Sequence, residues 1–169
     1  MTLEQPEVQL LADVVDQVRQ LLASRRADTP QDPLAGLTGI PDGPSTAPED
    51  PALARLLPDF SRDDTELSAG MRMLHEPDLI AAKDAAAVAL LDSLPLGGGT
   101  LRLSPETAAQ WLSALNDVRL ALGVRLGIVE DEVAPELDRP ELQGSGQMMF
   151  DVYRWLSAVQ DSLVTAMLD

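Results

Sequence analysis

The spacing of apolar residues limits the fold of this chain more than any other feature. Near the C-terminus, apolar side chains recur at alternating intervals of three and four residues: Met149, Val152, Leu156, Val159, Leu163 and Met167. This spacing places the residues on one helical face, close to the seam of a coiled coil. A similar recurrence follows Pro6 and ends near Arg26. We therefore predict amphipathic helices over about 148–168 and 6–26.

Prolines and caps mark the helices in the middle of the chain. Pro51 begins a short helix that stops before Pro58. Asp63 precedes Glu66 by three residues, which is a capping-box analogue at the start of the next helix. Pro77 permits a bend or a fresh start before the next segment.

Alanine-rich and leucine-rich segments complete the helical pattern. The run from Asp78 to Leu94 is strongly helical in composition. Ser104 and Pro105 form an N-cap and first-position pair for a helix over 105–127, which Gly127 ends. The segments TLEQPE and TLRLSPE share an extended Leu before a Pro-led helix, so they could pair as a small β-bridge.

The composition supports one helical domain. Apolar residues make up 45% of the 169 residues but aromatic residues only 3%, so the core must consist of Leu, Val and Ala, which suits packing of helix on helix. We predict an all-α bundle of about five helices in a single domain over 1–169. Residues 27–50 form a Pro/Gly-rich loop or linker in this interpretation, and residues 129–147 an acidic mobile loop.

Charge and cysteine content exclude several functions. The formal net charge is -16, which repels nucleic-acid phosphates and anionic lipids and attracts basic protein surfaces. There is no cysteine, so disulfides, thiolate metal sites and thiol redox switches are excluded. The chain has no apolar run long enough to span a bilayer and no secretion signal at its start, and we expect it to be cytoplasmic.

No catalytic arrangement is recognisable in the sequence. His75 is the only histidine, so a two-histidine metal site cannot form within one chain. The glycines at 97–99 lack the Lys-Ser/Thr of a phosphate-binding loop and indicate a turn. We therefore expect no enzyme activity, no metal site and no cofactor.

Two cations on inward helical faces are the most informative feature. Lys83 lies among leucines and alanines of the 78–94 helix, and Arg119 falls in the apolar sector of the 105–127 helix. A buried charge is costly unless it is paired, so each cation needs a carboxylate, a route to water or an anionic ligand. A structural ion-pair network is the first alternative. A pocket for an anionic ligand at Lys83, Asn116 and Arg119 is the second.

The 105–127 helix also has an apolar strip on its other side. Leu120 and Val124 form this strip, so the helix is either central in the bundle or part of an interface with a partner. We include both residues among the candidate ligand or partner residues.

Several sequence blocks together resemble a known family. LARLLPDFSRDD, AAQWLSALNDVRLALGVRLGI and VYRWLSAVQDSLV are similar, in this order, to an actinobacterial family catalogued as a domain of unknown function, the AosR-like proteins. The resemblance extends from about Pro6 to Val164. It implies a cytoplasmic actinobacterial protein with a helical fold and a regulatory role in oxidative stress through other proteins. Implied partners are a sigma factor, another polymerase component or a protease adaptor.

Three functions remain compatible with the sequence. The leading hypothesis is a non-enzymatic regulatory or adaptor protein that binds a basic protein surface, in transcription or stress regulation. The alternatives are a DNA-binding transcriptional regulator and a binder of a small anionic ligand at Lys83 and Arg119. Homodimerisation through the C-terminal heptad seam is compatible with all three. Because the chain lacks cysteine, no thiol-based sensing attributed to relatives can operate in it.

Overall fold

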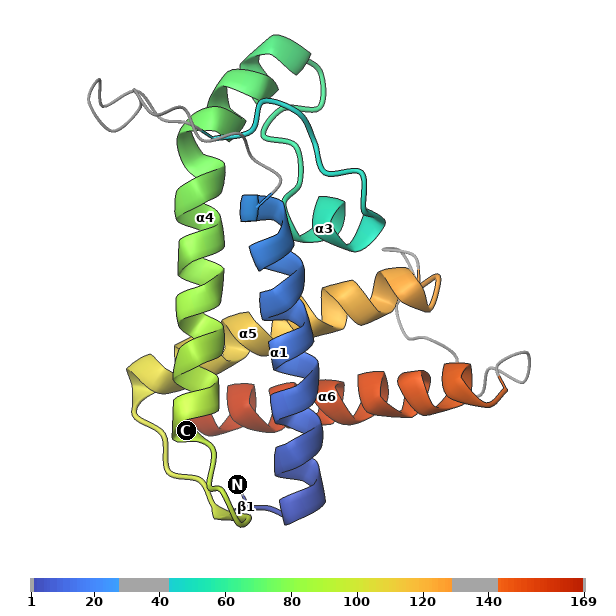
Figure 1. The fold of residues 1–169 in the computed structure, drawn as a ribbon. Helices are drawn as coiled ribbons and strands as arrows, with labels where there is room; N and C mark the ends of the chain where they lie inside the picture. Colours follow the sequence, from blue (N-terminus) through green and yellow to red (C-terminus); the bar gives the residue numbers. More distant parts are fainter. Residues whose placement is uncertain (1, 28–42, 129–142, 169) are drawn as a thin grey trace.

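The described residues form five α-helices and one small antiparallel sheet (Figure 1). The computed structural model describes residues 2–27, 43–128 and 143–168. The helices are α1 (Gln5–Ala27), α3 (Pro51–Leu56), α4 (Thr65–Ser93), α5 (Pro105–Arg125) and α6 (Ser145–Leu168). The predicted all-α bundle is therefore confirmed. Most of the predicted linker at 27–50 and acidic loop at 129–147 lies outside the described residues.

The helices form two crossed pairs (Figure 1). α1 and α4 lie side by side and antiparallel, and they cross the antiparallel pair of α5 and α6 at a steep angle. α5 contacts each of the other four helices, and the short α3 packs on α5 and α1. The helix that carries Arg119 is thus the central helix of the bundle.

One apolar core joins all five helices. As predicted, its side chains are mostly aliphatic, with a single buried tryptophan. The most deeply buried members are Leu11, Val15, Leu22, Leu56, Leu57, Leu90, Trp111, Leu115 and Leu156. The Trp111 indole N–H donates to Ser93 Oγ at 2.7 Å, so the largest core side chain keeps a hydrogen bond.

The predicted β-bridge is present. β1 (Thr2–Leu3) pairs antiparallel with β2 (Gly99–Thr100), which fixes the start of α1 beside the connection to α5. The sheet is short, because β2 consists of Gly99 and Thr100 alone. Gly98 has a φ of 80°, and a side chain there would lie 2.8 Å from the backbone nitrogen of Gln5, so this close approach requires glycine.

Two predicted helix limits are corrected by the structure, and Pro77 lies at a bend, one of the two predicted alternatives. The N-cap of α4 is Asp64, whose side chain accepts from the Leu67 amide, and not Asp63. The helix then continues through Pro77 to Ser93 as one element, although its N-terminal part is inclined to the rest (Figure 1). α6 begins at Ser145, three residues before the predicted start.

Candidate functional site

The first inward-facing cation, Lys83, has a carboxylate partner. Its Nζ donates to Asp117 Oδ1 at 2.6 Å, which links α4 to the central helix α5. The Asp117 side chain is 4% exposed and the Lys83 side chain 16% exposed. This geometry is that of a structural ion pair with partial access of the ammonium group to water.

The same pair shifts the ionisation of the carboxyl group. Burial raises the pKa of Asp117 above its ordinary value, because the charged form loses its hydration. The hydrogen bond from Lys83 and its positive charge oppose this shift. The dominant effect on Asp117 is therefore desolvation, although a cation lies beside it.

The second cation, Arg119, faces α6. It donates from Nη1 to Gln160 Oε1, and its guanidinium lies 5.3 Å from the centre of the Tyr153 ring. Its Nε is buried and has no hydrogen-bond partner among the described residues. Arg119 thus joins α5 to α6 through an amide and an aromatic ring.

The remaining sequence-predicted site residues lie at or near the surface of α5. Asn116 is exposed, Val124 is half-buried, and Leu120 is half-buried against the core. Asp117 and Arg119 are about 200° apart around the helix. Lys83 and Arg119 therefore bind partners on different sides of α5, and the structure does not bring them into one pocket.

A larger buried ionic network lies where the last turn of α1 meets the first half of α4. It was not predicted from the sequence. Glu76 is fully buried and accepts from Arg25 Nε at 2.7 Å and from Arg72 Nη1. Arg72, only 1% exposed, also donates to the Leu57 carbonyl and to Asp59 Oδ1, the latter at 2.7 Å. Arg25 and Arg72 thus donate to the same carboxylate, that of Glu76.

This network connects segments that are distant in the sequence. Arg25 lies in the last turn of α1, and it also donates to the carbonyl of Thr46 in the segment before α3. Arg72 and Glu76 are one turn apart on α4, and Asp59 lies between α3 and α4. The network therefore holds the end of α1, the first half of α4 and both flanking segments of α3 together.

The histidine has no comparable environment. His75 is exposed on α4, and its ring centre is 6.1 Å from that of Phe60 at an interplanar angle of 42°. This is a tilted aromatic contact at the surface. It places the ring beside the α3–α4 connection.

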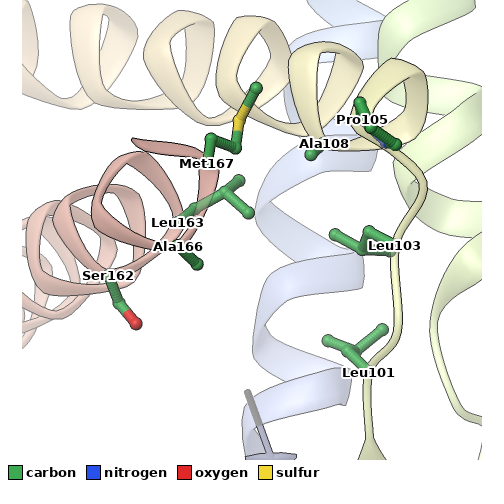
Figure 2. A pocket seen from close by; sticks show the side chains of 8 residues that line it. All are labelled: Leu101, Leu103, Pro105, Ala108, Ser162, Leu163, Ala166 and Met167. Carbon is green, nitrogen blue, oxygen red and sulfur yellow. The ribbon is translucent and has the colours of Figure 1, made fainter. Parts of the chain in front are cut away.

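An apolar groove lies where the C-terminal turns of α6 meet the start of α5 (Figure 2). Its volume is about 300 Å³. Its lining residues are Leu101, Leu103, Pro105, Ala108, Ser162, Leu163, Ala166 and Met167. Leu101 and Leu103 point toward α6, and Leu163 points back toward them (Figure 2). The groove was not predicted from the sequence, although its α6 wall is the end of the predicted heptad seam.

The α6 wall of the groove is open to solvent. Met167 is 43% exposed, and the neighbouring Val164 and Leu168 are 40% and 83% exposed. Apolar side chains are therefore exposed on the last turns of α6. Single exposed apolar residues are ordinary on protein surfaces, but an open apolar groove marks a place where another molecule can bind.

Comparison with known proteins places the chain in a family. The family described as "Domain of unknown function (DUF2017)" matches residues 1–167. A protein of Mycobacterium leprae named "Putative oxidative stress regulator AosR" is 42% identical over 175 residues, which cover 96% of this chain and 79% of that protein. The "Oxidative stress regulator AosR" of Mycobacterium tuberculosis is 39% identical over 178 residues, with 96% of this chain and 78% of that protein covered.

Two further findings complete the comparison. No solved structure matches this chain. None of the described helices combines the length and apolar character needed to cross a membrane. The match to the family model extends from the first residue to the last turn of α6 and includes the buried ionic network and the groove. The chain therefore belongs to the DUF2017 family, together with the mycobacterial AosR proteins.

Proposed function

We propose that this protein is a non-enzymatic regulator that acts through contacts with other proteins in stress-responsive transcription. The observation that carries the proposal is the similarity over 96% of the chain to proteins named oxidative stress regulators. A sigma factor or another component of RNA polymerase is the proposed class of partner, and a protease adaptor is the alternative that the family resemblance implies.

The geometry of the described residues supports binding of a protein in preference to binding of a small anion. Lys83 is paired with Asp117, Arg25 with Glu76, and Arg72 with both Glu76 and Asp59. These cations stabilise contacts between helices. The groove at the end of α6, in contrast, offers apolar surface that is open to solvent. Apolar surface of this kind suits a protein partner.

The signal in this proposal cannot be thiol oxidation within the chain. The sequence contains no cysteine, so no disulfide can form in response to an oxidant. Any response to oxidative stress must therefore act through the partner, through expression or through another chemical group. The proposed function does not depend on which of these operates.

Affinity capture tests the proposed function. The immobilised protein is incubated with actinobacterial lysate at about 0.05 M and 0.2 M salt, and bound proteins are identified by mass spectrometry. An unrelated protein of similar net charge serves as the control bait. We expect specific enrichment of a sigma factor, a polymerase subunit or a protease adaptor, with less bound at the higher salt concentration.

Two results would contradict the proposal. The first is a set of captured proteins identical to that of the acidic control bait. The second is tight binding to duplex DNA by the purified protein at physiological salt, which would favour the DNA-binding alternative. Both results can be recognised before the partner is identified.

A further inference from the structure

The segments that line the apolar groove are more acidic than basic. Glu106 and Asp161 are exposed and adjacent in sequence to the lining residues Pro105 and Ser162. Glu4 is exposed directly after β1, which pairs with the strand that precedes Leu101. On the same segments, the exposed basic side chain is Arg102. Exposed carboxylates thus outnumber exposed cations on the segments that carry the lining residues.

The end of α6 adds to this negative potential. The last carbonyl groups of a helix carry partial negative charge, which a lysine or arginine in the last turn commonly offsets. α6 has no basic residue in its last turn. Its C-terminal turn forms one wall of the groove, so a positively charged group on a bound partner would be attracted to this end.

The shape of the apolar surface fits a helix. The lining residues of α6 extend from Ser162 to Met167, so this wall of the groove is about two turns long. Apolar residues at helical spacing on a partner can lie in such a groove, with their charged neighbours at its rim. A second copy of this chain fits less well, because two copies each carry a formal net charge of -16 and repel one another.

We propose that this groove binds an amphipathic helix of a partner protein, with apolar residues on one face and lysines or arginines beside them. The proposal rests on the proposed function and assigns its binding surface. Ala166 lines the groove and is itself exposed, so its replacement by a larger residue obstructs the groove without removing a core side chain.

A designed peptide provides a direct test. The probe is a fluorescent helical peptide with leucines at helical spacing and lysines elsewhere, and a peptide with glutamates in place of the lysines is its control. Binding is measured by fluorescence anisotropy to the wild type, to Ala166→Arg and to Ala81→Arg. Ala81 is exposed on α4, so the two variants carry the same net charge and differ only in where the arginine lies.

We expect the lysine peptide to bind the wild type and Ala81→Arg equally, and Ala166→Arg at least about tenfold more weakly. Ala166→Trp, which fills the groove without a charge, should weaken binding in the same direction. Circular dichroism confirms that each variant is folded. Equal binding of the lysine peptide to both arginine variants would overturn the proposal, and so would preferential binding of the glutamate peptide.

The remaining outcomes separate the groove from the proposed function. If Ala166→Arg captures the same polymerase or adaptor proteins from a lysate as Ala81→Arg, the groove is not the binding surface, although the regulatory function stands. If the wild type captures none of these proteins, the proposed function fails and the groove assignment fails with it. A dimer in sedimentation that only Ala166→Arg dissociates would assign the groove to a second copy and overturn the proposal.

Discussion

At the scale of single residues, the pair of Lys83 and Asp117 places a buried carboxylate beside one cation. We expect Lys83→Met to lower the free energy of unfolding by about 3 kcal/mol at neutral pH, because it leaves a buried carboxylate without its partner. The double variant Lys83→Met/Asp117→Leu should recover most of this loss, since it removes both charges. Urea denaturation measures both changes. A Lys83→Met variant as stable as the wild type would show that water solvates Asp117.

The raised pKa of Asp117 predicts how stability changes with pH. Its pKa in the folded protein lies above the ordinary value of 3.8, so between these two values the folded state binds a proton more readily than the unfolded state. The contribution of this group is therefore fully present below the unfolded pKa and is lost as the pH rises through the folded pKa.

Asp117→Asn isolates this effect, because asparagine does not titrate. We expect the stability of the wild type relative to Asp117→Asn to decrease as the pH rises through the folded pKa of Asp117. Denaturation of both proteins between about pH 3.5 and 7 gives this difference, and the carboxyl carbon shift of Asp117 in NMR gives the pKa itself. An opposite slope would mean that attraction to Lys83 outweighs desolvation.

At the scale of helices, Glu76 joins α4 to the end of α1. We expect Glu76→Gln to lower the free energy of unfolding by about 3–5 kcal/mol, because two largely buried arginines lose their shared anion. Asp59 binds the same Arg72, but its side chain is 58% exposed, so Asp59→Asn should cost less than about 1 kcal/mol. Thermal denaturation of both variants tests the contrast. Equal losses would show that burial does not determine the strength of these pairs.

A close contact at Pro77 also connects two elements. Proline lacks an amide hydrogen, so the carbonyl of Met73 has no helical partner at position 77. Gly43 lies against this turn, and a Cβ at position 43 would come within 2.9 Å of the Met73 carbonyl carbon. The segment before α3 therefore passes α4 at a distance that only glycine permits.

Gly43 and Gly70 should respond in opposite ways to replacement by alanine. Gly43→Ala should destabilise the protein by about 1–3 kcal/mol, because backbone atoms must move apart. Gly70→Ala, with no atom within 4 Å of its added Cβ and inside α4, should stabilise it by about 0.5–1 kcal/mol. Urea denaturation compares the two. A neutral Gly43→Ala would place this segment farther from α4.

Pro77 explains why the helices could be predicted from the sequence and the ionic network could not. Periodicity and Pro-led caps identified the helices, because these signals are local. Ser68, Arg72 and Glu76 continue the buried face of Ile80 toward the N-terminus at four-residue spacing. That face is visible in the sequence only if the helix is read through Pro77. The groove could not be predicted either, since it needs the relative placement of two helix ends.

At the scale of the whole molecule, a buried ionic network and an open apolar groove lie at different places in the crossed helix pairs. The ionic network lies at the junction of α1, α3 and α4, where charges are buried and paired. The groove lies where α6 ends beside α5, where apolar side chains remain exposed. The first arrangement stabilises the fold, and the second is the one that we propose to bind a partner.

The net charge of the whole chain leads to the last prediction. With 28 acidic and 12 basic residues, repulsion between carboxylates opposes the compact state, and salt screens it over about 10 Å at 0.1 M. The buried pairs at Glu76 and Asp117 are screened much less.

We therefore expect the melting temperature to rise by a few degrees between about 0.02 M and 0.3 M sodium chloride. Choline chloride at the same ionic strength should give the same rise, because screening does not depend on the identity of the cation. A fall in the melting temperature would show that exposed ion pairs outweigh the repulsion, and a rise with sodium alone would indicate a specific cation site.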